Sequence, residues 1–191
     1  MNKKISTKTL ALCSILTAIV VILQFMGAFL RFGPFSVSLV LIPIVIGAAL
    51  CGPAAGAWLG FAFSVVVFLS GDAGAFLALS VPGTLITVLL KGTLCGLVAG
   101  LVCKLLEKHN RYLAVTVAAI VCPIVNTGIF LLGCRLFFWD AIISWGQAEG
   151  FNDVAKYVIF VLVGGNFLFE LGLNVFLSPI ITRILKTSGI R

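Results

Sequence analysis

The chain has 191 residues, of which 61% are hydrophobic and 10% are charged, and its mean hydropathy is +1.24. This composition excludes a soluble domain, in which about 25% of the residues are usually charged. The net charge of +7 indicates contact with anionic lipid at the ends of membrane helices rather than nucleic-acid binding.

Six apolar stretches predict membrane helices, which need about 20 residues each. In chain order they are 8–27, 36–51, 54–70, 80–104, 113–133 and 157–185. The second and third are short and are separated by the turn Cys51-Gly52-Pro53, so five spans remain possible if these two merge. The sequence therefore predicts an all-α integral membrane protein, a six-helix bundle formed by a single domain over residues 1–191.

The distribution of charge predicts the orientation. The cations form three clusters: Lys3, Lys4 and Lys8; Lys104, Lys108 and Arg111; and Arg183, Lys186 and Arg191. With six spans all three clusters lie on one side of the membrane, which the positive-inside rule assigns to the cytoplasm. Both termini are then expected inside. The outer connections contain four of the acids, Asp72, Asp140, Glu149 and Asp153.

Several motifs of soluble enzymes are missing. The chain has no Gly-x-x-x-x-Gly-Lys-Ser/Thr loop and no Gly-x-Ser-x-Gly nucleophile. Its six cysteines are scattered singly along the sequence, which contains one histidine. Without the first of these loops it is not expected to hydrolyse ATP by itself. We expect no metal site, no disulfide framework and no cofactor, since cysteines spaced in this way are typical of apolar packing.

Five polar residues lie deep in the predicted spans. Lys91 is in the fourth, Asn126 is in the fifth, and Asn166, Glu170 and Asn174 share one face of the last at i, i+4 and i+8. A charge at the bilayer centre costs about 2.5–3.5 kcal/mol, so such residues usually face a partner, a cavity or a substrate. At about 1.5 Å per residue, Lys91 and Glu170 are roughly 16 and 19 Å below the outer ends of their helices and could meet.

Two interpretations of these residues stay open. In the first, Lys91 and Glu170 form a buried pair that fixes helix register, and the asparagines make interhelical hydrogen bonds. In the second, the same groups line a pocket that opens outward, with Lys91 available to an anionic substrate.

The outer connections are rich in aromatic residues, among them Phe35, Trp139 and Trp145. Such residues are typical of the membrane interface. They are equally suited to a lid over a small organic ligand, because apolar walls with a few polar contacts form most small-molecule sites.

Small residues predict where helices approach one another. The run Gly52 to Gly60 and the series Gly92, Gly96 and Gly100 favour close packing within the chain. Ser14 and Ala18 form a small-x-x-x-small patch on the first helix, which could seat a helix of another protein.

A family resemblance covers nearly the whole chain. It is carried by LIPIVIGAALCGPAAGAWLG at 41–60, the patch of Ser14 and Ala18, GLVAGLVCK at 96–104 and PIVNT at 123–127. These segments resemble the substrate-binding S components of energy-coupling factor (ECF) vitamin transporters, with the riboflavin- and pantothenate-type branch closest.

The resemblance implies a multi-pass protein of the bacterial plasma membrane that captures a vitamin at its outer face. It implies partners as well: a transmembrane coupling subunit and two cytoplasmic ATPases, on which the loaded protein docks and topples to release the vitamin inside. Ser14 and Ala18 correspond to the family's Ala-x-x-x-Ala contact with the coupling subunit, with Ser at the first position. Residues 29–36 would gate the site, and the last three helices would supply most ligand contacts.

The substrate expected from the residues is an anion. Lys91 complements a carboxylate, and a charge-assisted contact in a dry pocket is strong, so pantothenate is our leading hypothesis. Riboflavin, which would use the aromatic residues and the asparagines, remains open, as do folate and other vitamins.

Two other classes of function also remain. A self-sufficient secondary transporter would use ion chemistry around Glu170 and usually a second structural repeat, which we do not find. An intramembrane enzyme would need a nucleophile or base near the interface, for which Asp140 is the sole modest candidate, so we do not expect an enzyme.

Overall fold

Long apolar helices make up most of the computed structural model, which describes the backbone of residues 7–27, 31–32, 35–36 and 39–188 and the side chains of 7–27 and 39–183. Its elements are α1 Thr7–Gly27, α2 Leu41–Cys51, α3 Pro53–Leu69, α4 Gly74–Leu79, α5 Val81–Leu106, α6 Arg111–Phe137, α7 Trp139–Ala148, α8 Val154–Tyr157, the π-helix η1 Val158–Gly164 and α9 Gly165–Ser188. Two short strands, β1 Arg31–Phe32 and β2 Phe35–Ser36, pair antiparallel with Arg31 opposite Ser36 and Phe32 opposite Phe35. The side chain of Phe35, a predicted site residue, lies outside the described ones.

Four helical segments are long and apolar enough to cross a membrane: Thr7–Gly27, Val81–Leu106, Arg111–Phe137 and Val154–Arg183. The predicted second and third spans correspond to the shorter apolar helices α2 and α3, of 11 and 17 residues. Gly52 separates these two helices with a φ of 91°, a conformation that favours glycine, and Pro53 begins α3. The predicted helical, multi-span class is therefore confirmed, and four of its helices are candidate spans of full length.

Local sequence explains where α5 and α6 begin. The Ser80 hydroxyl accepts a hydrogen bond from the Gly83 N–H at 3.3 Å, and Pro82 occupies the first turn of α5. The Asn110 side chain accepts from the N–H groups of Tyr112 and Leu113 at 2.9 and 3.3 Å. Side chains of this kind satisfy the free N–H groups of a first helical turn.

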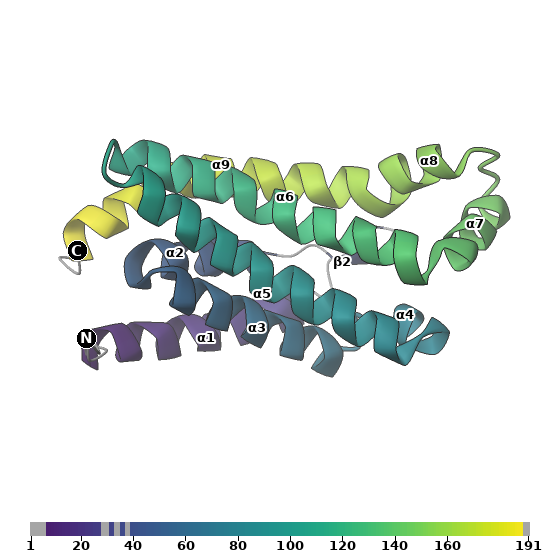
Figure 1. The fold of residues 1–191 in the computed structure, drawn as a ribbon, viewed down its shortest axis with the longest axis horizontal. Coiled ribbons are helices and arrows are strands. Elements are labelled where there is room, and N and C mark those ends of the chain that lie inside the picture. Colours follow the sequence, from purple (N-terminus) through teal and green to yellow (C-terminus); the bar gives the residue numbers. More distant parts are fainter. Residues whose placement is uncertain (1–6, 28–30, 33–34, 37–38, 189–191) are drawn as a thin grey trace.

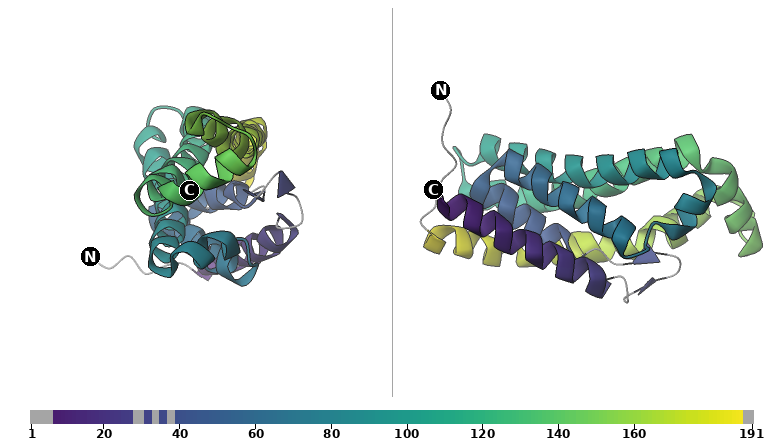
Figure 2. Two further views of the ribbon diagram at one scale, coloured as in Figure 1. Left: turned by 90° about the vertical axis from the view of Figure 1, so that its right-hand side faces the viewer. Right: turned by 90° about the horizontal axis from the view of Figure 1, so that it is seen from below.

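The long helices lie side by side, with both ends of the described chain at the same end of the molecule (Figure 1). The end-on and lower views of Figure 2 show the same bundle, with α7 and α8 projecting at the opposite end. α5 packs most extensively on α6 and α3, while α9 packs on α6. The connection predicted between the fifth and last spans is thus largely helical, which the sequence did not indicate.

Glycines bring α3 and α5 together, as predicted. A Cβ atom at Gly56 would fall within 3.0 Å of the Gly96 carbonyl oxygen, and one at Gly60 would collide with Gly92 in the same way. Backbones can approach this closely only where side chains are missing. This contact fixes the position of α5, which carries Lys91.

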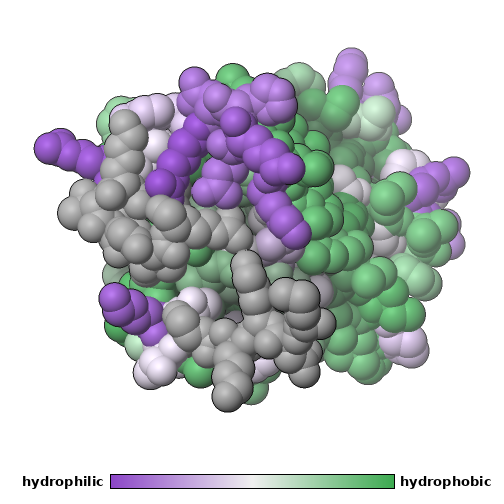
Figure 3. All heavy atoms as spheres, turned by 60° about the vertical axis from the view of Figure 1, so that its left-hand side comes forward, coloured by the Kyte–Doolittle hydropathy of each residue, from purple (hydrophilic) through white to green (hydrophobic). Residues whose placement is uncertain are grey.

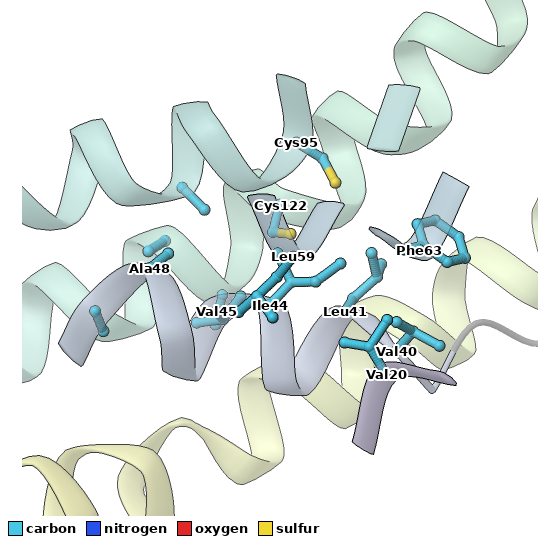
Figure 4. Close-up of a cluster of buried hydrophobic side chains, with 14 of the residues drawn as sticks. Val20, Val40, Leu41, Ile44, Val45, Ala48, Leu59, Phe63, Cys95 and Cys122 are labelled. Atoms are coloured by element: carbon cyan, nitrogen blue, oxygen red, sulfur yellow. The ribbon is translucent and has the colours of Figure 1, made fainter. Parts of the chain in front are cut away.

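Apolar side chains from α1, α2, α3, α5 and α6 form the larger core, which contains Val20, Ile44, Leu59, Phe63 and Cys122 (Figure 4). Hydrophilic residues gather on the end of the molecule that holds both chain ends, beside a hydrophobic flank (Figure 3). Exposed Leu132 and Phe176, at 63% and 75%, lie on membrane-spanning segments, as expected for contact with lipid.

Candidate functional site

Lys91 lies on α5 between two aromatic rings from other helices. Its ammonium nitrogen is 5.6 Å from the ring centroid of Phe63 on α3 and 5.4 Å from that of Phe130 on α6. A cation within about 6 Å of a ring centroid is attracted to the face of that ring, by about 0.5–2 kcal/mol. The charge is thus held inside the bundle next to apolar walls.

The packing of α5 on α6 brings Asn126 to the level of Lys91. The two helices run antiparallel, with the Cys103 thiol donating to the Ala114 carbonyl at 3.6 Å and Thr87 packed on Gly133. Counting between these two contacts places Lys91 opposite about Gly128, half a turn from both Asn126 and Phe130.

The packing of α6 on α9 adds the polar face of the last span. The hydroxyls of Thr116 and Ser178 hydrogen-bond at 3.2 Å across these two helices. Counting along both helices from this contact places Asn126 opposite about Leu168, between Asn166 and Glu170. Glu170 is only 5% exposed, so its side chain lies within the bundle. Counting along the helices thus puts Lys91, Asn126 and the pair Asn166 and Glu170 at about the same level of the bundle.

We call this set the polar layer: Thr87, Lys91, Asn126, Asn166, Glu170 and Asn174. Four of its buried oxygens have no hydrogen-bond partner within the described part of the chain, namely Thr87 Oγ1 and the Oδ1 atoms of the three asparagines. The Asn174 side-chain N–H donates to the Glu170 carbonyl at 2.8 Å, so the bond it makes stays within α9. A buried polar atom without a partner costs about 1–3 kcal/mol, which makes these oxygens suited to accept hydrogen bonds from a ligand.

An aromatic cluster adjoins the polar layer. Phe76 of α4 lies 5.6 Å from Phe130, 5.0 Å from Phe138 and 5.6 Å from Trp145, all edge to face. Predicted site residue Trp145 is thus linked to Lys91 through Phe76 and Phe130. The ring of Trp139 instead lies 4.5 Å from the guanidinium carbon of Arg135, which is exposed.

The sequence reasoning missed several of these residues. Gln24 of α1 is 2% exposed, and its amide N–H donates to the Asp72 carboxylate at 2.6 Å. Thr87 could have been found, because it is one helical turn from Lys91 on the same face. The phenylalanines could not, because nothing distinguishes Phe63 or Phe130 among sixteen phenylalanines.

The predicted docking patch lies on an open face of the protein. Ser14 and Ala18 are both exposed, and the Ser14 hydroxyl donates to the Leu10 carbonyl at 3.0 Å. Ser14 lines a groove of about 570 Å³ between α1 and α3, whose walls include Thr17, Ala54 and Trp58. Because the Ser14 hydroxyl already donates within α1, a helix packed on the patch meets small side chains and need not accept a hydrogen bond from this hydroxyl.

The described residues contain no group of three His, Cys, Asp or Glu side chains that could hold a metal ion. The six cysteines are free thiols. The polar layer therefore offers amide oxygens, one ammonium and one carboxylate, which are groups that bind a small polar organic molecule.

The family model described as "ECF transporter, substrate-specific component" matches residues 8–182. No curated protein matches the chain. Among solved structures, ThiT from Listeria monocytogenes serovar is similar with a TM-score of 0.66 and 22% sequence identity, over 94% of this chain and 94% of that one. At this identity the likeness shows a shared fold. The family match confirms the resemblance seen in the sequence.

Proposed function

Because the chain belongs to the family of substrate-specific components of ECF transporters, we propose that it captures a vitamin in the polar layer for uptake into a bacterial cell. Membership of this family makes it a substrate-binding transport protein of the membrane and not an enzyme.

The observation that supports the polar layer as the binding site is its set of partnerless oxygens. Asn126 Oδ1 is buried and without a partner among the described residues, so no interhelical hydrogen bond uses this oxygen. A ligand that donates hydrogen bonds to these oxygens removes their desolvation cost. Binding in this layer therefore gains energy from groups that the empty protein leaves unsatisfied.

Lys91 favours a carboxylate at one end of the ligand. Pantothenate remains the leading candidate, because its carboxylate suits the ammonium while its two hydroxyls and amide N–H suit the asparagine oxygens. Riboflavin, which is neutral, would depend on the aromatic cluster, as would the ring system of folate. We propose Phe35, Trp139 and Trp145 as further ligand contacts.

The proposed topology has six spans, with α2 and α3 as the short second and third, and both termini in the cytoplasm. It is supported by the position of both described chain ends at one end of the bundle (Figure 1). We further propose that the patch of Ser14 and Ala18 docks on a coupling subunit that works with two ATPases. In this proposal the whole chain acts as a single domain of the plasma membrane.

Mass spectrometry of the small molecules released on denaturing the detergent-purified protein tests the substrate. We expect pantothenate at close to one per chain, and binding of added pantothenate to emptied protein by calorimetry. A panel of pantothenate, riboflavin, folate and the cation thiamine separates the charge classes. A folded protein that neither carries nor binds any vitamin would favour a secondary transporter built on Glu170.

A further inference from the structure

The last membrane segment is not a regular α-helix. Between α8 and α9 it contains the π-helix η1, Val158–Gly164, which ends two residues before Asn166. A π-helix is rare and holds more residues per turn than an α-helix, and it occurs often at functional sites. It lies directly before α9, whose polar face begins at Asn166.

Burial along this segment shows what the π-helix does. Tyr157 is 1% exposed and Leu162 is 3% exposed, five residues later. From Leu162 the inward positions recur every four residues, at half-buried Asn166, whose Oδ1 is buried, and at buried Glu170, Asn174 and Ser178. The step of five residues therefore occurs once, within η1.

A continuous α-helix could not turn both Tyr157 and the polar face of α9 inward. Tyr157 is fixed by the aromatic ring of Phe151 at 5.6 Å and by Gly146, against which it packs. Steps of four residues from Tyr157 would turn Gly165, Phe169 and Leu173 inward. Because one residue rotates an α-helix by about 100°, Glu170 and Asn174 would then face away from α6.

Gly164 is where the sequence permits this extra residue. A Cβ atom there would fall within 3.0 Å of the carbonyl oxygen of Ile159, the residue five positions earlier. This is the carbonyl that a π-turn brings next to residue 164. A Cβ atom at the neighbouring Gly165 would have open space around it. Of these two glycines, only Gly164 therefore excludes a side chain.

We infer that Gly164 is a positioning residue for the ligand site: its missing side chain permits the π-turn that rotates Asn166, Glu170 and Asn174 toward α6. The inference builds on the proposed function, since it assigns the orientation of the proposed binding groups. The orientation itself can be measured without any ligand.

Disulfide formation between α6 and α9 reports that orientation. Asn126→Cys is combined with either Glu170→Cys or Phe169→Cys, and peptide mass spectrometry identifies the linked pair among the native cysteines. The wild-type background should favour the pair at 126 and 170. Gly164→Ala should shift the preference to 126 and 169, whereas the matched control Gly165→Ala should leave it unchanged. An unchanged preference in Gly164→Ala would overturn the inference.

A second variant separates orientation from simple misfolding. Deleting Val161 in the Gly164→Ala background shortens the step from Tyr157 to Leu162 to four residues. A regular α-helix then turns both Tyr157 and the polar face inward. We expect this double change to restore the pair at 126 and 170, and failure to do so in a monodisperse protein contradicts the inference.

Binding provides an independent readout in the chain without added cysteines. Affinity for pantothenate should fall roughly tenfold or more in Gly164→Ala, because several hydrogen bonds are misdirected, and recover with the deletion. If wild-type protein binds no pantothenate while the disulfide preference still shifts, the proposed substrate is wrong and the positioning inference stands.

Discussion

A lysine ammonium inside a membrane bundle needs compensation, and Lys91 receives part of it from aromatic rings. The ring centroids of Phe130 and Phe63 lie 5.4 and 5.6 Å from its nitrogen. These contacts reduce the cost of an intramembrane charge. They do not use the Oδ1 atoms of Asn126, Asn166 and Asn174, which have no partner among the described residues, so a ligand carboxylate with neighbouring donor groups can be added to the layer.

Replacing Lys91 by methionine tests its role in binding an anion. We expect Lys91→Met to weaken pantothenate binding by well over tenfold, because removing one partner of a buried charge pair costs about 2–5 kcal/mol, and about 1.4 kcal/mol is a factor of ten. Calorimetric titration of the purified protein measures this. Lys156→Met, at an exposed position of α8, serves as the matched control, and equal affinity in both variants would remove Lys91 from the site.

Asn126→Leu separates a ligand contact from a structural one. Since Asn126 Oδ1 has no partner among the described residues, an apolar side chain of similar size should leave the melting temperature of the empty protein unchanged or raised. Vitamin affinity should nevertheless fall.

Gln24→Leu provides the contrast to Asn126→Leu. It removes a hydrogen bond to Asp72 that is already made at 2.6 Å, so it should lower the melting temperature by thermal unfolding in detergent. A large loss of stability in Asn126→Leu would support the interpretation of the asparagines as interhelical hydrogen-bond residues.

Polar residues in apolar spans were the part of the site that the sequence could predict. Lys91, Asn126 and Glu170 are conspicuous because each is costly in a membrane, and helical spacing alone put Glu170 on one face with the asparagines. The contact of Gln24 with Asp72 joins positions 48 residues apart. No local pattern carries such information, since it depends on how α1 packs beside the turn after α3.

At the level of elements, hydropathy and length predicted the long helices within a few residues, because a membrane sets both. The fifth predicted span, 113–133, corresponds to α6 Arg111–Phe137. The predicted last span began at 157, one residue before a π-helix that no apolar pattern reveals. The π-helix follows instead from the spacing between Tyr157, which packs inward, and the polar face from Asn166 onward, because this spacing does not fit a regular α-helix.

The exposed patch on α1 gives a prediction at the same level. Ala18→Trp should leave vitamin binding unchanged, because Ala18 faces outward from a helix that contributes no residue to the polar layer. It should reduce uptake by cells that contain the ECF module to background, because a bulky ring prevents close helix packing. Uptake of labelled pantothenate measures this, with Leu132→Trp, which places the ring at an exposed position on α6, as control. Normal uptake by Ala18→Trp would contradict the docking role.

The whole molecule is polarised along its length, and its charge pattern bears on how transport is energised. Lys104, Lys108 and Arg111 lie at or near the ends of α5 and α6 that meet at the hydrophilic end, while α4 and α7 lie at the other (Figures 1 and 3). The polar layer lies between these ends, and the sequence contains no Gly-x-x-x-x-Gly-Lys-Ser/Thr motif. In the proposed function, the coupling subunit and the two ATPases supply the energy, and this chain supplies the binding site.

Reconstitution into liposomes tests this division of roles. The purified chain alone should bind pantothenate yet accumulate none, with or without an imposed proton or sodium gradient, because in the proposed function the energy comes from the coupling subunit and the two ATPases. Addition of the coupling subunit, the two ATPases and ATP should start accumulation. Gradient-driven uptake by the chain alone, abolished by Glu170→Gln, would instead identify a secondary transporter in which the same carboxylate carries the coupling ion.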